Sequence, residues 1–236
     1  MNEEREWKYL KKRPPREVTE RFYELTTPMV SDALDKLGLP AGAGGIVPMY
    51  PGCKKIVGPA ITMKVVPFGK YNPKGHMGGD IIKVAEPGDI LVYDNGGRLD
   101  QNCWGDILAW SAIKRGIAGT IAFGAMRDIE ECEAIGYPIY AMGSVPTTGR
   151  GRVVQLDYNC PINLCGIQCC PGDLVMADRN GIAVIPCDRA AEVLEVALDI
   201  KSREEAMIAE IKAGIDFTTV DEKSGYDTFL RRDKGR

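Results

Sequence analysis

Apolar and polar positions follow two different periods in the middle of this chain. A short apolar run at 90–93 comes after the turn signal Pro87-Gly88, and the polar, glycine-containing segment 94–97 breaks it. Residues 107–113 then place apolar side chains at helical spacing, and a second apolar run occupies 117–123. The order strand, helix, strand predicts a parallel βαβ unit with a right-handed crossover.

The ends of this unit carry polar residues that we expect to meet. Asp106 is a good N-cap for the predicted helix, and Gly116 is typical of the residue that follows one. In a βαβ unit the N-terminus of the helix and the end of the next strand lie on the same side of the sheet. Asp106 and the pair Arg127-Asp128 should therefore converge, in the crevice where open α/β sheets bind ligands.

The same patterns predict elements on both sides of the central unit. A hairpin is expected around Asp178-Arg179-Asn180-Gly181, and a long amphipathic helix follows it. The predicted elements are helices at 18–25, 27–37 and 188–213, and strands at 56–66 (interrupted at Gly58-Pro59), 139–142, 153–156, 174–177 and 182–185.

Helical segments at both ends of a run of short strands predict an α/β layered sandwich. We expect a single domain over residues 18–214. Residues 1–17 are dense in charge and are expected to form an arm outside it, either a frayed terminus or a segment that packs on a neighbouring subunit. Residues 215–236 are expected to form a polar, only partly ordered tail.

The composition of the chain argues against nucleic-acid-binding and membrane-spanning proteins. The chain is 44% hydrophobic and 27% charged, which is ordinary for a globular protein with a sizeable core. Its formal charge of −3 gives no basis for a nucleic-acid partner. No apolar run approaches the length of a transmembrane helix, and the first residues are acidic and polar rather than signal-like. We therefore expect a cytoplasmic protein with no nucleic acid and no membrane as partner.

The cysteine and histidine residues suggest two other kinds of site, a zinc or redox site and a histidine general base. Cys160, Cys165, Cys169 and Cys170 cluster, but their spacings do not repeat the paired C-x2-C of structural zinc sites. We expect buried free thiols in β structure. His76, the only histidine, lies in the predicted loop 69–79 without an orienting partner, and we expect it at the surface.

One spacing carries a resemblance. Asp106, twenty residues, Arg127-Asp128, two residues and Glu131 resemble the D-x20-R-D-x2-E/D signature of the 4-hydroxy-4-methyl-2-oxoglutarate / 4-carboxy-4-hydroxy-2-oxoadipate aldolases. These class II pyruvate aldolases form one family with the regulator of ribonuclease activity A. The likeness runs from about residue 27 to about residue 214. It implies the family's αββα sandwich, here with helical N- and C-terminal extensions, assembled as a homotrimer or as a hexamer (a dimer of trimers).

The resemblance also implies a chemistry. A divalent cation, Mg²⁺ or Mn²⁺, would support retro-aldol cleavage of a 4-hydroxy-2-oxo acid to pyruvate, and oxaloacetate decarboxylation through the same enolate. Asp128 would bind the metal directly, while Asp106 and a neighbouring subunit's Glu204 would bind through water, with Glu205 as the alternative to Glu204. Arg127 and Asp106 are the expected catalytic residues. The expected substrate contacts are Gly105, Asp106, Ile107, Leu108 and Arg127.

Two other functions compete with this lyase. A non-catalytic protein-binding regulator, like the ribonuclease regulator, would need no metal, and the intact acidic and arginine set argues against it. A methyltransferase is disfavoured because no G-x-G-x-x-G loop follows an early strand. The general base and the identity of the 2-oxo acid do not follow from the sequence.

Overall fold

The computed structural model of this chain describes residues 12–71 and 77–231. One sheet carries its strands in the order β1-β5-β4-β3-β2-β9-β10, and β6 pairs with β2 as well. These strands are β1 (Val47–Pro48), β2 (Ile56–Pro67), β3 (Ile90–Asn102), β4 (Gly119–Met126), β5 (Ile139–Ser144), β6 (Val153–Tyr158), β9 (Leu174–Asp178) and β10 (Gly181–Ile185). A separate hairpin joins β7 (Ile162–Leu164) to β8 (Ile167–Cys169).

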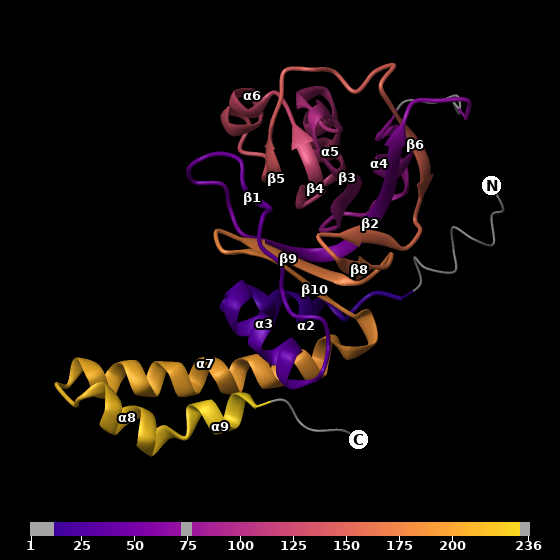
Figure 1. The fold of residues 1–236 in the computed structure, drawn as a ribbon. Helices are drawn as coiled ribbons and strands as arrows, with labels where there is room; N and C mark the ends of the chain where they lie inside the picture. The colour runs from indigo at the N-terminus through magenta and orange to yellow at the C-terminus, as the bar shows by residue number, and fades with distance from the viewer. Residues whose placement is uncertain (1–11, 72–76, 232–236) are drawn as a thin grey trace.

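Helices cover this sheet on two sides (Figure 1). They are α2 (Arg16–Arg21), α3 (Thr27–Lys36), α4 (Gly79–Val84), α5 (Asp106–Arg115), α6 (Ile129–Ala134), α7 (Ala190–Lys212), α8 (Phe217–Ser224) and α9 (Tyr226–Leu230). Two single 3-10 turns lie at Phe22–Glu24 and Cys187–Arg189. Within the described residues, no helix is long and apolar enough to cross a membrane.

The long strand β2 connects the two layers of the sandwich. Its first residues, 56–59, pair antiparallel with β9, while 60–64 pair parallel with β3 and 63–67 pair antiparallel with β6. Helices α2, α3 and α7 lie over β9 and β10, whereas α4, α5 and α6 lie beyond the parallel strands β2 to β5 (Figure 1). The order helix, sheet, sheet, helix confirms the predicted αββα fold.

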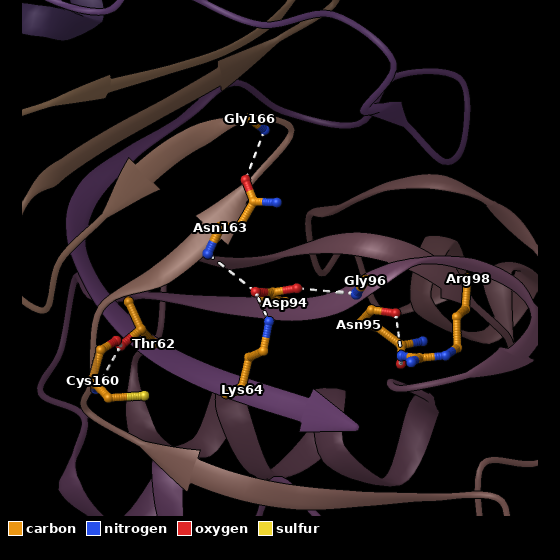
Figure 2. A network of polar contacts seen from close by, with 9 residues as sticks. All are labelled: Thr62, Lys64, Asp94, Asn95, Gly96, Arg98, Cys160, Asn163 and Gly166. Atoms are coloured by element: carbon orange, nitrogen blue, oxygen red, sulfur yellow. Dashed lines mark hydrogen bonds and ion pairs between the residues drawn. The ribbon is translucent and has the colours of Figure 1, made fainter. Parts of the chain in front are cut away.

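The strand β3 runs further than its apolar pattern predicts. The prediction that 94–97 ends the strand is wrong, because Gly96 (φ 64°) and Gly97 (φ 71°) adopt left-handed conformations that turn the chain within it. Figure 2 shows how polar contacts hold this turn: Asp94 accepts the Gly96 amide at 3.0 Å, and Arg98 reaches back to the Asn95 carbonyl at 2.8 Å. The strand then pairs again with β4 and ends at Asn102.

The buried Asp94 carboxylate also ties the separate hairpin to the sheet. It accepts Lys64 Nζ from β2 at 2.5 Å and the Asn163 amide of β7 at 3.0 Å (Figure 2). The predicted break in β2 at Gly58-Pro59 does not occur. Gly58 is needed there because a Cβ would lie 2.2 Å from the Gly88 carbonyl oxygen.

Both ends of the chain contact the domain. The expected partly ordered tail is wrong for residues 216–231, which form α8 and α9 and pack back along α7 (Figure 1). Tyr226 of α9 donates a hydrogen bond to Glu204 at 2.6 Å, and the Phe229 ring lies 4.0 Å from the Arg203 guanidinium carbon. In the arm, residues 1–11 lie outside the described part, but Arg13 pairs with buried Asp89 of its own chain.

Several local predictions are confirmed. The β9–β10 hairpin is antiparallel around 178–181, and the long helix covers nearly the predicted range. All eight cysteines are free; Cys160 and Cys169 are buried, as predicted, whereas Cys165 and Cys170 are only half-buried. The predicted position of His76 lies outside the described residues.

Candidate active site

A pocket of about 590 Å³ opens at the end of β4 and the start of α5. One wall is the segment 104–108 together with Arg127 and Asp128. The opposite wall is formed by the loop 148–151 and by strand β6. Phe68, Tyr71, Met77, Asp80, Asn102 and Cys103 complete the lining.

The predicted convergence of Asp106 with Arg127 and Asp128 is confirmed. Asp128 Oδ2 accepts the backbone amide of Asp106 at 3.2 Å and lies 3.3 Å from Arg127 Nε. Asp128 adopts a left-handed backbone conformation (φ 58°, ψ 44°) as the N-cap of α6. Such a conformation is uncommon outside glycine and is most easily tolerated by short polar residues such as aspartate. The crossover therefore joins groups separated by twenty residues into one contact.

Gly105 makes this contact possible. A Cβ at this position would lie 2.4 Å from Asp128 Oδ2, so any larger residue would push the carboxylate away from the helix. Gly105 is also the N-cap of α5, and the helix begins at Asp106. The predicted N-cap was thus one residue too late, because the close approach of Asp128 selects glycine for the cap.

The backbone amides at the start of α5 belong to two of the expected substrate contacts, Ile107 and Leu108. The Ile107 amide donates to Asp106 Oδ1 at 2.7 Å, so it is already engaged and is not a free anion-binding donor. Leu108 lines the pocket, and its amide is among the first of the helix, which have no acceptor within the helix. The Leu108 amide and Arg127 are therefore available to an anionic ligand, whereas the Ile107 amide is already engaged.

The site brings opposite charges together in a partly enclosed place. The Arg127 side chain is 36% exposed and that of Asp128 27%, while Arg127 Nε itself is buried without a hydrogen-bond acceptor in the described residues. Burial, reinforced by Asp128, Asp106 and Glu131, raises the pKa of the nearby Cys132 thiol to about 12. Cys132 therefore stays protonated at neutral pH and is a poor metal ligand or nucleophile.

Two carboxylates, Asp106 and Asp128, are the oxygen donors on this wall. Among the described residues, no group of three or more histidine, cysteine, aspartate or glutamate side chains could enclose a metal ion. This set fits Mg²⁺ or Mn²⁺ better than a structural metal, because Mg²⁺ is usually held by one or two carboxylates and keeps its remaining positions for water and substrate oxygens.

The other predicted acidic residues do not reach this pocket within one chain. Glu131 is exposed on α6. Glu204 and Glu205 lie on α7, in the helical layer on the far side of the sheet (Figure 1). Glu204 is engaged by Tyr226, whereas the Glu205 side chain is 65% exposed and has Lys201 at 3.9 Å.

Sequence reasoning missed part of the lining. Tyr71, Met77 and Asn102, which are not among the predicted substrate contacts, line the pocket. The wall at 148–157 was not expected, because its apolar pattern indicated only a short strand. Trp104 is 1% exposed and stacks on Tyr137 at 5.9 Å, so it forms a rigid base for the segment that carries Gly105 and Asp106.

The sequence of this chain matches a family and several known proteins. Residues 27–184 match the family described as RraA-like, aldolase/RraA. A Halalkalibacterium halodurans protein named "Putative 4-hydroxy-4-methyl-2-oxoglutarate aldolase" is 32% identical over 207 residues, which cover 82% of this chain and 90% of that protein. Legionella pneumophila DlpA is 36% identical over 185 residues, 78% of this chain, but this chain spans only 30% of DlpA.

A solved structure agrees with these matches. Streptomyces coelicolor RraAS2, described as an unusual member of the RNase ES inhibitor RraA protein family, superposes with a TM-score of 0.75 at 28% identity. The match covers 82% of this chain and 96% of that one.

Proposed function

The chain belongs to the RraA-like family, and on that premise we propose that it is a divalent-metal-dependent lyase. Its reaction is retro-aldol cleavage of a 4-hydroxy-2-oxo acid, of the 4-hydroxy-4-methyl-2-oxoglutarate type, to pyruvate, with oxaloacetate decarboxylation as a side activity. The observation that carries the proposal is the contact of Asp128 with both Arg127 and the start of α5 inside the pocket.

Asp128 and Asp106 would hold the metal at the wall of the pocket. When bound there, Mg²⁺ or Mn²⁺ supplies a Lewis acid that polarises the keto oxygen of the substrate. The ion pair between Asp128 and Arg127 keeps the guanidinium beside the carboxylates, so that a cation-binding and an anion-binding group face the same small volume.

Arg127 would stabilise the charge that grows during cleavage. Breaking the C3–C4 bond leaves the pyruvate enolate, whose negative charge develops on the former keto oxygen. A guanidinium fixed before the substrate arrives stabilises that charge without reorganisation, which is the main source of such catalysis. The substrate carboxylate would lie at the start of α5, next to the Leu108 amide.

A further carboxylate would come from a neighbouring chain, as in the resembling aldolases, in a trimer or hexamer. The contacts of α7 favour Glu205 over Glu204 for this role, because Glu204 is held by Tyr226 in its own chain while Glu205 is exposed. A homo-oligomer is then part of the proposed active site.

Pyruvate release tests the proposal. Purified protein would be given 4-hydroxy-4-methyl-2-oxoglutarate or oxaloacetate, and pyruvate would be detected with lactate dehydrogenase and NADH, with the metal-only rate subtracted. We expect activity that disappears with chelator and returns with Mg²⁺ or Mn²⁺. Asp128→Ala should lose both metal binding and activity, while Glu130→Gln, an exposed carboxylate on the same short helix, should keep both.

Full activity after exhaustive chelation would contradict the metal-dependent mechanism. If metal-loaded protein releases no pyruvate from either substrate, the non-catalytic regulator becomes the better assignment. The description of RraAS2 as a member of an RNase inhibitor family is the observation that keeps this second function open.

A further inference from the structure

Asn102 lies between the two walls of the pocket and is 7% exposed. It is the last residue of β3, after the turn at Gly96-Gly97 that the Asp94 and Arg98 contacts hold (Figure 2). Without this turn the strand would not pair again with β4, where Asn102 lies opposite Ala125. The position of Asn102 is therefore set by the polar network of β3.

Three polar groups of Asn102 form hydrogen bonds with the two walls of the pocket. Its backbone amide donates to the Thr147 carbonyl at 3.0 Å, and its side-chain oxygen accepts the Gly149 amide at 2.5 Å. Its side-chain nitrogen donates to the Trp104 carbonyl at 3.0 Å. The first two bonds hold the loop 147–151, and the third holds the opposite wall.

The hydrogen bond to Trp104 connects Asn102 to Arg127. The Trp104 carbonyl also accepts the backbone amide of Arg127 at 3.1 Å. One carbonyl oxygen thus receives both the Asn102 side chain and the Arg127 backbone. Loss of one partner of a buried hydrogen bond removes its stabilisation, so removal of the Asn102 donor should loosen the segment that places Arg127.

Gly149 shows how tightly the other wall is fitted. A Cβ at Gly149 would lie 2.3 Å from the Asn102 carbonyl oxygen and 2.8 Å from Val153 Cγ2. A larger residue would therefore push the loop outward without removing any polar group of Asn102. Thr148 and Arg150, on either side of Gly149, line the pocket.

We propose that Asn102 is a positioning residue that couples the substrate-facing loop 147–151 to the Trp104–Arg127 contact. It sets the width of the pocket through Gly149 and the placement of Arg127 through Trp104. The kinetic part of this inference rests on the proposed lyase function; the coupling itself does not.

Two substitutions separate the effects of the Trp104 contact and the Gly149 contact of Asn102. Asn102→Asp keeps an acceptor for the Gly149 amide but loses the donor to Trp104, so kcat should fall by roughly tenfold to a hundredfold while KM stays nearly unchanged. Gly149→Ala leaves Asn102 intact but displaces the loop, so KM should rise by about tenfold with kcat retained. Asn163→Asp makes the same change at an exposed position of β7 outside the pocket lining, where the side chain keeps an acceptor for the Gly166 amide. It is the matched control and should leave both constants unchanged.

Hydrogen exchange measured by mass spectrometry gives a second readout that needs no substrate. Asn102→Asp should speed exchange in the peptide around Arg127 and spare 147–153, while Gly149→Ala should do the opposite. If the protein cleaves no 2-oxo acid, the lyase proposal fails and the exchange pattern alone decides on the coupling. Unchanged exchange in both peptides, or kinetics of Asn102→Asp that match those of Asn163→Asp, would overturn it.

Discussion

Replacing Arg13 should expose how much the N-terminal arm contributes to stability. Arg13 forms an ion pair with Asp89, whose side chain is completely buried, and its second guanidinium nitrogen donates to Asp89 Oδ2 at 3.0 Å. The Glu86 amide donates to the same oxygen at 2.7 Å. In Arg13→Ala the carboxylate keeps this amide bond but loses its only counter-charge at hydrogen-bond distance among the described residues.

The cost follows from breaking a buried ion pair by removing one partner, which destabilises proteins by about 3–5 kcal/mol. We expect about 3 kcal/mol, the lower end, because Arg13 is 20% exposed and Asp89 retains an amide donor. For a chain of this length each kcal/mol lowers Tm by about 2–4 °C, so Tm should fall by roughly 6–12 °C. Arg16, whose side chain is 90% exposed in a pair with Glu20, provides the matched control, and Arg16→Ala should change Tm little.

The effect should depend on pH with a definite sign. Burial raises the pKa of Asp89 above its ordinary 3.8, and the hydrogen bond and charge of Arg13 oppose that shift. Without Arg13 the folded-state pKa rises further, so the penalty is absent below the unfolded pKa and grows as pH rises through the folded pKa. Melting curves followed by circular dichroism should show a large deficit at pH 7 and a small one near pH 4.

Asp89→Asn in the Arg13→Ala background removes the charge and should restore much of the loss at pH 7. The reasoning would be refuted if Arg13→Ala melted within 2 °C of the Arg16→Ala control at pH 7, or if its deficit were the same at both pH values. Either result would mean that the arm does not neutralise Asp89 in solution.

Two further predictions concern the proposed active site. Arg127→Lys keeps a positive charge but loses the planar fork of donors, so it should lower kcat by roughly a hundredfold and leave Mg²⁺ affinity unchanged; equal loss of both would show that Arg127 acts through the metal site. Glu205→Gln should weaken Mg²⁺ binding by the oligomer, whereas Glu204→Gln should mainly lower Tm through the lost Tyr226 contact. The reverse pattern would assign the neighbour's ligand to Glu204, and no effect of either on Mg²⁺ binding would exclude both.

The sequence predicted the parts of the site that local pattern and topology determine. Strand, helix and strand each have their own apolar period, and right-handed crossover then forces Asp106 toward Arg127 and Asp128. The same reasoning could not find Asn102. A glycine pair after a strand normally indicates its end, and here left-handed Gly96 and Gly97 instead carry the strand onward to that residue.

The C-terminal helices show another limit of sequence patterns. Helices α8 and α9 are short and rich in polar residues, so their own propensity is weak. They are held by specific contacts with residues of α7, such as Tyr226 with Glu204 and Lys223 with Glu210 at 2.7 Å. Contacts of this kind depend on which side chains meet in space, and neither period nor composition encodes that.

Two glycines connect these observations to the chemistry. Gly105 lets the Asp128 carboxylate approach the start of α5, and Gly149 lets the opposite loop approach Asn102. Neither position requires a left-handed backbone, since the structure gives a positive φ for neither, so close approach is the reason for glycine at both. A methyl group at Gly105 would separate the acidic residues from each other, whereas one at Gly149 would only widen the pocket. In the proposed lyase, Gly105 therefore keeps Asp128 beside the start of α5, and Gly149 keeps the pocket narrow.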